Sequence, residues 1–423
     1  MNRYRSLVIA LGVPLLLMGC VDDSPSSDGQ VLLIDDAGAD GSINDAVLEL
    51  DAADGADGGS LADVMAPPAG DAGPPPLGEC APEAGEVAIH GLFYLDDDES
   101  ERSTYTGGPT SDDAQFQGGI VVIGNDAAEV ETCDDGSYVV TGLEDGVVLA
   151  QPVIEEGRRC TTANCPGRFA SAIADDRRPV MVTFGDSIAV IGDQPMFPER
   201  IRTLFAGLTD IDNRNVAVGG STSVDWLPER RYFGERLAPH LEDADLLIIT
   251  IGGNDILQYV SGLGIPNDIP AAVEGARQVV LRVIENMTEI LAAIRAVNPD
   301  ADIAYCLYAD YSQATEHPIW GLVGNFLGPD TVADILELAR RNFPTDDEHL
   351  ILIDMFGAAQ GLPLHDYLYD QLHFNDLGQS LYAEEVFETL GGVLVGESPL
   401  GSTGTSPLGL RRSYGVSPMA GAE

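Results

Sequence analysis

Four short motifs in the second half of the chain carry residues that suit nucleophilic chemistry. A serine hydroxyl is a poor nucleophile at neutral pH, so it needs a base such as an imidazole, whose ordinary pKa lies near 6.5. An aspartate one turn before a histidine can hold that imidazole in the required tautomer. These residue types occur in Gly185-Asp186-Ser187, Gly219-Gly220-Ser221-Thr222-Ser223, Gly252-Gly253-Asn254-Asp255 and Asp370-Gln371-Leu372-His373.

The elements around these motifs alternate between apolar strands and helical stretches. Pro270 to Val297 has apolar residues three and four apart behind Asp268, which predicts a long amphipathic helix with an aspartate cap. Continuous apolar strands suit a parallel sheet that is covered on both faces. The pattern therefore predicts an α/β fold, a three-layer doubly wound parallel sheet of flavodoxin-like type. The expected strands are Val180 to Phe184, Asn215 to Val218, Leu246 to Ile251, Ile303 to Tyr308 and Leu350 to Ile353.

In such folds ligands bind beyond the carboxyl ends of the strands, and this gives a positional test for each motif. The first three motifs follow the first three predicted strands, and the Asp370 motif comes after the fifth. A second aspartate and histidine at the same spacing, Asp346 and His349, precede the fifth strand. We therefore expect that rival pair at the opposite edge of the sheet from Ser187.

The order, spacing and placement of the four motifs resemble those of the SGNH or GDSL hydrolase family, from about Arg178 to Gly392. The resemblance implies that Ser187 is the nucleophile, that His373 is the base and that Asp370 orients it. It also implies an oxyanion hole formed by Ser187, Gly220 and Asn254, with Gly219 as the alternative to Gly220. A backbone N-H at a glycine and an uncharged amide are suitable donors for a negatively charged carbonyl oxygen.

The resemblance implies an esterase that needs no metal and no organic cofactor. We expect short-chain acyl esters on a glycan as substrates, and a lysophospholipase or thioesterase acting on lipids is the alternative, since this fold serves all of these activities. A non-catalytic glycan-binding protein, or a purely structural envelope protein, is the competing interpretation. Trp226, Tyr308, Tyr311 and Trp320 lie near the ends of predicted strands and could stack on a sugar or belong to the core.

The amino terminus predicts export. Arg3 and Arg5 precede an apolar run that is too short to span a bilayer, and the run ends in Leu17-Met18-Gly19-Cys20, which looks like a bacterial lipobox. Residues 1–20 are therefore expected to be a lipoprotein signal peptide. Lipidation of Cys20 would hold the protein at a membrane of the cell envelope.

Two further segments precede the large domain. Residues 21–78 are rich in Asp, Gly, Ala, Ser and Pro, which predicts a disordered acidic tether. Between residues 84 and 155, short apolar runs alternate with turn residues, which predicts a small β-sandwich. The stretch from Glu131 to Gly146 resembles carboxypeptidase-regulatory-like modules. The large domain is expected over residues 176–395 and a disordered tail over 396–423.

The cysteines fit an exported chain. Cys160 and Cys165 flank a four-residue loop, and the simplest assignment is two disulfides, Cys160 to Cys165 and Cys80 to Cys133, with Cys306 buried and free. The pairing cannot be deduced from the sequence. A zinc site is the rival interpretation, but no second cysteine pair or closely spaced histidine pair accompanies Cys160.

The composition excludes one class of partner. The chain of 423 residues has 69 acidic and 21 basic side chains, a formal net charge of -48, and no lysine. Because nucleic-acid binding depends on basic residues that neutralise phosphates, a nucleic-acid partner is excluded. The acidic surface suits a saline environment, although a GC-rich genome would also favour arginine over lysine. We expect a monomer.

Overall fold

The computed structural model describes residues 167–395 apart from 264–267, 315–328, 344–346, 348 and 371. Between residues 89 and 160 it describes mainly the strands, and beyond 395 only residues 400, 419 and 420. The predicted signal peptide, the tether and most of the predicted tail lie outside the described residues, as do Cys20, Cys80, Cys165 and Trp320.

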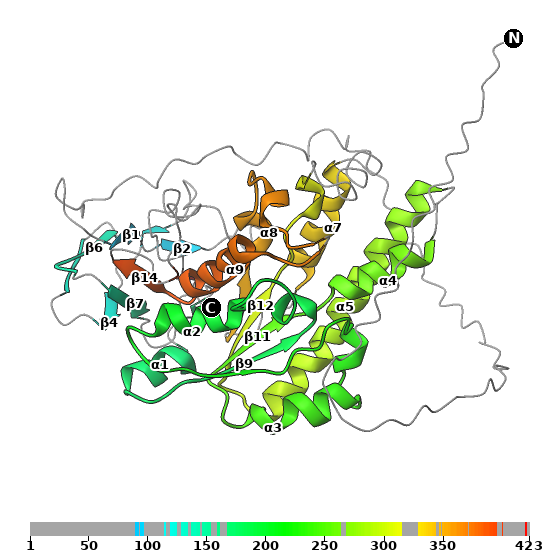
Figure 1. Cartoon of the computed structure of the whole chain (residues 1–423). Coiled ribbons are helices and arrows are strands. Elements are labelled where there is room, and N and C mark those ends of the chain that lie inside the picture. The colour runs from blue at the N-terminus through cyan, green and yellow to red at the C-terminus, as the bar shows by residue number, and fades with distance from the viewer. Residues whose placement is uncertain are drawn as a thin grey trace, which may run out of the picture. The chain divides into compact units, whose positions relative to one another are not determined.

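A parallel sheet that includes β9, β11 and β12 forms the centre of the large domain (Figure 1). It has five strands in the order β10-β9-β11-β12-β13. Every neighbouring pair is parallel. This architecture confirms the predicted α/β fold. The strands are β9 (Val180–Gly185), β10 (Asp212–Asn215), β11 (Leu246–Thr250), β12 (Asp302–Cys306) and β13 (Leu350–Ile353).

Alternate residues of the inner strands enter two different hydrophobic clusters, one on each face of the sheet. In β11, Leu246 and Ile248 belong to one cluster, while Leu247 and Ile249 belong to the other. All four side chains are fully buried. Because successive side chains of a strand point to opposite faces, this division shows that both faces are covered, and the fold has three layers.

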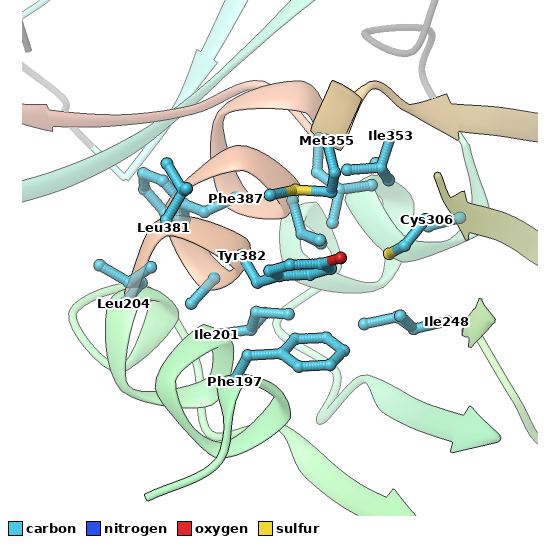
Figure 2. Packing of buried hydrophobic residues seen from close by; sticks show 14 of the residues in the cluster. Phe197, Ile201, Leu204, Ile248, Cys306, Ile353, Met355, Leu381, Tyr382 and Phe387 are labelled. Atoms are coloured by element: carbon cyan, nitrogen blue, oxygen red, sulfur yellow. The ribbon is translucent and has the colours of Figure 1, made fainter. Parts of the chain in front are cut away.

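One face of the sheet packs against α1 (Arg168–Ala174), α2 (Phe197–Phe205) and α9 (Asp376–Thr389). Helices α2 and α9 contact each other directly. Figure 2 shows Phe197, Ile201 and Leu204 of α2 facing Tyr382 of α9, with Ile248 of the sheet beside them. The short helix α8 (Met355–Ala358) follows β13 and contributes Met355 to the same cluster.

The opposite face packs against a second set of helices, which the other cluster joins to the sheet. Helix α5 confirms the predicted long amphipathic helix, because it runs over Ile269–Val297 and the Asp268 side chain accepts the N-H of Ala271 at 3.1 Å. The neighbouring elements are η4 (Ser223–Trp226), η5 (Phe233–Leu237), α3 (Ala238–Leu241), α4 (Gly253–Leu263) and α7 (Pro329–Asn342).

The second strand differs from the prediction. The apolar pattern predicts this strand at Asn215 to Val218, whereas β10 covers the polar residues Asp212–Asn215. The strand lies at the edge of the sheet, so its side chains are only partly buried and need not be apolar. The apolar stretch continues along β9, since the N-H groups of Val216 and Val218 donate to backbone carbonyls of that strand.

The predicted small β module is present, and one of its sheets includes a strand from the far end of the chain. Strand β14 (Gly392–Val395), which follows α9, pairs antiparallel with β7 (Gly146–Val153), and β7 pairs with β4 (Gly119–Ile123). Leu149 of β7 belongs to the same buried cluster as helices α2 and α9. The module and the large domain therefore share a sheet and a core.

The remaining strands form two small sheets. The first contains β1 (Ile89–Leu92), β6 (Ser137–Thr141) and β5 (Glu129–Thr132) in that order. The second has the order β3-β2-β15-β8. Its strands are β3 (Ala114–Gln115), β2 (Tyr94–Asp96), β15 (Met419–Ala420) and β8 (Arg159–Cys160).

Two of the cysteines can be assigned. Cys306 of β12 is free and buried, as predicted. Cys133 is disulfide-bonded, and its partner is not among the described side chains, so the two pairings stay predictions. Among the described residues, none of the helices combines the length and the apolar character needed to cross a membrane.

Candidate active site

The turn after β9 holds Ser187 at the carboxyl edge of the sheet. Gly185 has φ +132°, and a Cβ atom there would lie 2.1 Å from the carbonyl oxygen of Thr250, so the position requires glycine. The N-H of Asp186 donates to that same carbonyl at 2.8 Å. Ser187 then begins a short helical turn, η3 (Ser187–Ala189), and its side chain is partly exposed.

Asp186 has a buried carboxyl group, which is only 2% exposed. Its Oδ1 accepts the N-H of Ile188 at 3.1 Å, and its Oδ2 accepts the hydroxyl of Tyr308. Burial raises the pKa of Asp186 to about 7, although hydrogen bonds from Tyr308, Ile188 and Thr250 oppose the rise. A carboxyl directly beside Ser187 therefore changes its charge near neutral pH.

Asp370 and His373 form a hydrogen-bonded pair on one tight turn. Nδ1 of His373 lies 2.7 Å from Oδ2 of Asp370, and Oδ1 of Asp370 accepts the N-H groups of Leu372 and His373, each at 2.8 Å. The N-H of Tyr369 closes the turn on the carbonyl of His373 at 2.7 Å. Burial would raise the pKa of Asp370, but the hydrogen bonds outweigh it and the pKa lies below its ordinary value.

Backbone contacts bring the turn after Ser187 against the residue that follows His373. Gly192 forms an isolated bridge with Phe374, and the N-H of Asp193 donates to the Phe374 carbonyl at 3.3 Å. Gly192 has φ +141°, and a Cβ atom there would lie 2.3 Å from the same carbonyl oxygen. The peptide segments of the serine and the histidine are thus neighbours, although they are far apart in the sequence.

The Ser187 hydroxyl itself is not hydrogen-bonded within the described part of the chain, either to His373 or to another group. Hydrogen bonds between a nucleophile and its base are often long or misaligned before substrate binds, and they tighten in the complex. Because Nδ1 of His373 is engaged by Asp370, Nε2 is the ring nitrogen that remains for the serine.

Hydrogen bonds join two of the predicted oxyanion-hole segments, the loop that carries Gly220 and the start of α4, which carries Asn254. The Asn254 side chain, in the first turn of α4, donates to the carbonyl of Ser221 at 2.9 Å. The next residue, Asp255, accepts the N-H of Ser223 at 2.9 Å and its hydroxyl at 2.7 Å. Gly220 has φ +80° with open space where a Cβ would be. The start of α4 therefore fixes the loop after β10, and one N-H of the Asn254 amide stays available.

The rival histidine lies at the opposite edge of the sheet, as expected. His349 immediately precedes β13, and its Nδ1 is 3.4 Å from Oδ1 of Asp302 at the first position of β12. Asp346 lies outside the described residues. No group of three or more side chains suited to binding a metal ion is found within the described part of the chain.

Two tyrosines after β12 support the site, a role that was not predicted from the sequence. The hydroxyl of Tyr311 donates to the carbonyl of Leu372 at 2.9 Å, beneath the turn that carries His373. Tyr308 contacts Asp186, as described above. The signal available in the sequence was their position near the end of the fourth predicted strand, at the edge where the motifs meet.

The tryptophan after β10 belongs to the core. Trp226 has no exposed surface, its Nε1-H donates to Oγ of Ser221 at 2.9 Å, and its ring packs against Phe184 and Tyr232. The core alternative is therefore confirmed for this side chain. Tyr369, next to Asp370, is 59% exposed and is the aromatic side chain at the surface beside the histidine turn.

Solved structures that match part of the chain include several hydrolases. The lipase Lip_vut3 from a goat rumen metagenome has a TM-score of 0.40 at 17% identity, over 50% of this chain and 98% of its own. Phospholipase A1 from Streptomyces albidoflavus NA297 has a TM-score of 0.39 at 14% identity, over 50% and 99%. A two-domain esterase active on acetylated mannans has a TM-score of 0.34 at 14% identity, over 55% and 54%.

No curated protein is detectably similar to the chain in sequence. The family model of the GDSL-like lipase/acylhydrolase family matches residues 183–381, a range that contains all four motifs. This part of the chain is therefore a domain of the GDSL-like lipase/acylhydrolase family, a family of ester hydrolases.

Proposed function

We propose that the protein is a serine ester hydrolase in which Ser187, His373 and Asp370 form the catalytic triad. Ester hydrolysis in general follows from the family. The observation that carries the finer proposal is the 2.7 Å bond between Asp370 and His373, on a turn that lies against the segment following Ser187. That arrangement fixes the imidazole through Nδ1, so Nε2 is the nitrogen that could accept a proton from a serine.

In the proposed reaction, Oγ of Ser187 bonds to the carbonyl carbon of the ester while its proton moves to Nε2 of His373. Collapse of the tetrahedral intermediate breaks the bond to the alcohol oxygen, which takes that proton and leaves. Water then attacks the acyl-serine, His373 accepts the water proton and returns it to the serine, and a carboxylic acid is released. Asp370 stays ionised and stabilises the imidazolium.

The negative charge on the carbonyl oxygen needs donors that are already in place. The N-H groups of Ser187 and Gly220 and the remaining Asn254 N-H are the proposed donors. The bonds from α4 to Ser221 and Ser223 support this assignment because they hold the loop after β10 next to Asn254. Loss of one such donor typically costs about 3 kcal/mol in the barrier.

We propose short-chain acyl groups on glycans as substrates. The exposed Tyr369 beside Asp370 supports this, since an aromatic face at the surface can stack on a sugar ring. Lysophospholipids and thioesters are the alternatives, and a panel of acetylated polysaccharides and lysolipids separates them. We also propose that lipidation of Cys20 anchors the protein to a membrane of the cell envelope, and that a Cys20→Ser variant is released from the membrane fraction.

The test of the triad compares the full chain with a Ser187→Ala variant on p-nitrophenyl acetate and p-nitrophenyl butyrate. We expect the variant to lose turnover by at least about a thousandfold, because the nucleophile is absent. Equal turnover by both proteins would refute the proposal. Binding of an acetylated glycan without any turnover would instead identify a non-catalytic glycan-binding protein.

A further inference from the structure

We propose that Tyr308 is a positioning residue that ties the turn carrying Ser187 to the start of helix α4, which carries Asn254. This inference rests on the proposed function, because it assigns a role to a residue that does not itself touch the substrate. It concerns how the nucleophile and the oxyanion donors keep their separation during the reaction.

The phenol of Tyr308 contacts both segments. Its hydroxyl donates to Oδ2 of Asp186, the residue before Ser187. The start of α4 lies against the same phenol, because a Cβ atom on Gly253, the residue before Asn254, would lie 3.2 Å from the phenol oxygen. Tyr308 follows β12, so a residue from a third segment joins two segments that carry the chemistry.

The contact continues from Asp186 to the far side of the serine. The other carboxyl oxygen of Asp186 accepts the N-H of Ile188, so this carboxyl links the residue before Ser187 to the residue after it. Asp186 is 2% exposed, and hydrogen bonds in such a low-dielectric setting are stronger than in water. The phenol therefore acts on the serine turn through a rigid carboxyl rather than through a mobile surface group.

The packing at Gly253 shows how close this approach is. A Cβ atom at that position would lie 2.7 Å from Cε1 of the Tyr308 ring and 3.2 Å from its oxygen. A side chain at 253 would therefore push the phenol and the start of α4 apart. Glycine permits the close approach on which the hydroxyl contact depends.

A small displacement of either segment would slow the reaction. Misplacement of a reacting group by about 1 Å can cost on the order of a hundredfold in rate. Substrate binding should change little, because Tyr308 supports the backbone beneath the site. The expected signature is therefore a lower kcat with a nearly constant KM.

The first experiment measures ester hydrolysis by the full chain carrying Tyr308→Phe, which keeps the ring against Gly253 and removes only the hydroxyl. We expect kcat to fall about tenfold or more, with KM within about twofold of the wild type. The matched control is Tyr305→Phe, in the preceding strand. Tyr305 is also buried, and its hydroxyl donates to the Ile251 carbonyl at 2.7 Å without reaching Asp186. We expect its kcat to stay within about twofold.

A second pair of variants tests the contact from the other side and serves if Tyr308→Phe does not fold. Asp186→Asn keeps an oxygen for the Ile188 N-H and supplies an N-H to the Tyr308 oxygen, whereas Asp186→Ala removes both contacts. We expect Asp186→Asn to retain at least about a third of the wild-type kcat and Asp186→Ala to lose about tenfold or more. Urea unfolding by circular dichroism confirms that each variant is folded.

Equal kcat in the folded Tyr308→Phe and Tyr305→Phe variants would overturn the inference and leave the triad proposal intact. Equal losses in Asp186→Asn and Asp186→Ala would also overturn it, because charge rather than the hydrogen-bonded contact would then be what matters. Wild-type turnover that survives Ser187→Ala would refute the proposed function, and this inference with it.

Discussion

The buried carboxyl of Asp186 makes folding stability depend on pH in a predictable direction. In the folded chain its pKa is about 7, whereas the ordinary value is 3.8. The folded state therefore holds a proton that the unfolded state has released between these two pH values. The stabilisation that the protonated Asp186 carboxyl gives to the folded state is fully present below pH 3.8, and it is lost as the pH rises through 7.

The Asp186→Asn variant removes this titration without changing the shape of the side chain. At 1.36 kcal/mol per pKa unit, ionisation of Asp186 destabilises the folded wild type by about 2 kcal/mol at pH 5 and by about 4 kcal/mol at pH 8. The free energy of unfolding of the variant, minus that of the wild type, should therefore increase by about 2 to 3 kcal/mol between pH 5 and pH 8.

The assay is urea unfolding of the full chain, followed by circular dichroism at several pH values and constant ionic strength. The amide itself can add a constant offset, so the change with pH is the informative quantity. Ser187→Ala is the control, because it removes no titratable carboxyl and should differ from the wild type by an amount independent of pH. A constant or declining difference for Asp186→Asn would refute the reasoning about burial.

Three further outcomes follow from the contacts of the site and the core. Asp370→Asn should lower kcat by about a thousandfold to ten-thousandfold with little change in the urea midpoint, because the 2.7 Å bond that fixes His373 loses its charge. Steady-state kinetics on p-nitrophenyl acetate measure this loss of kcat, and a loss below tenfold would contradict the prediction. Gly192→Ala should reduce the free energy of unfolding by about 2 to 3 kcal/mol, since an added Cβ would lie 2.3 Å from the Phe374 oxygen at a positive φ; an unchanged urea midpoint would count against this contact. Leu149→Ala, in the β module, should cost about 2 to 5 kcal/mol and shift one shared unfolding transition; separate transitions for the module and the large domain would show that they do not share a core.

The inner strands and the longest helix could be predicted because their residues obey a simple period. The inner strand β11, at Leu246–Thr250, and the Asp268 cap of α5 lie where the pattern places them. The polar edge strand β10 could not be found in this way, since an edge position does not require apolar residues on both faces. Strand β14 was also missed as part of the module, because nothing local in Gly392–Val395 shows that it pairs with β7.

Some features of the site could likewise be predicted from the sequence, and others could not. Motifs that follow parallel strands must gather at one edge, so the closeness of the loop after β10 to Asn254 could be expected from order alone. The contact between Asp186 and Tyr308 could not, because it depends on side-chain packing between residues 122 positions apart. The catalytic roles of Ser187, His373 and Asp370 stay predictions until the variants are measured.

The pairing of β14 with β7 has a consequence for biosynthesis. A chain emerges from the ribosome beginning at its amino terminus, and β7 is made more than 200 residues before its partner. Until Val395 has been synthesised, one edge of β7 has no neighbour, and the apolar side chain of Leu149 has no helix α9 to cover it. An incomplete chain would therefore expose an unpaired, aggregation-prone strand edge for many seconds. Chaperones that bind nascent chains should matter more for this protein than for one whose small module contains all its own strands.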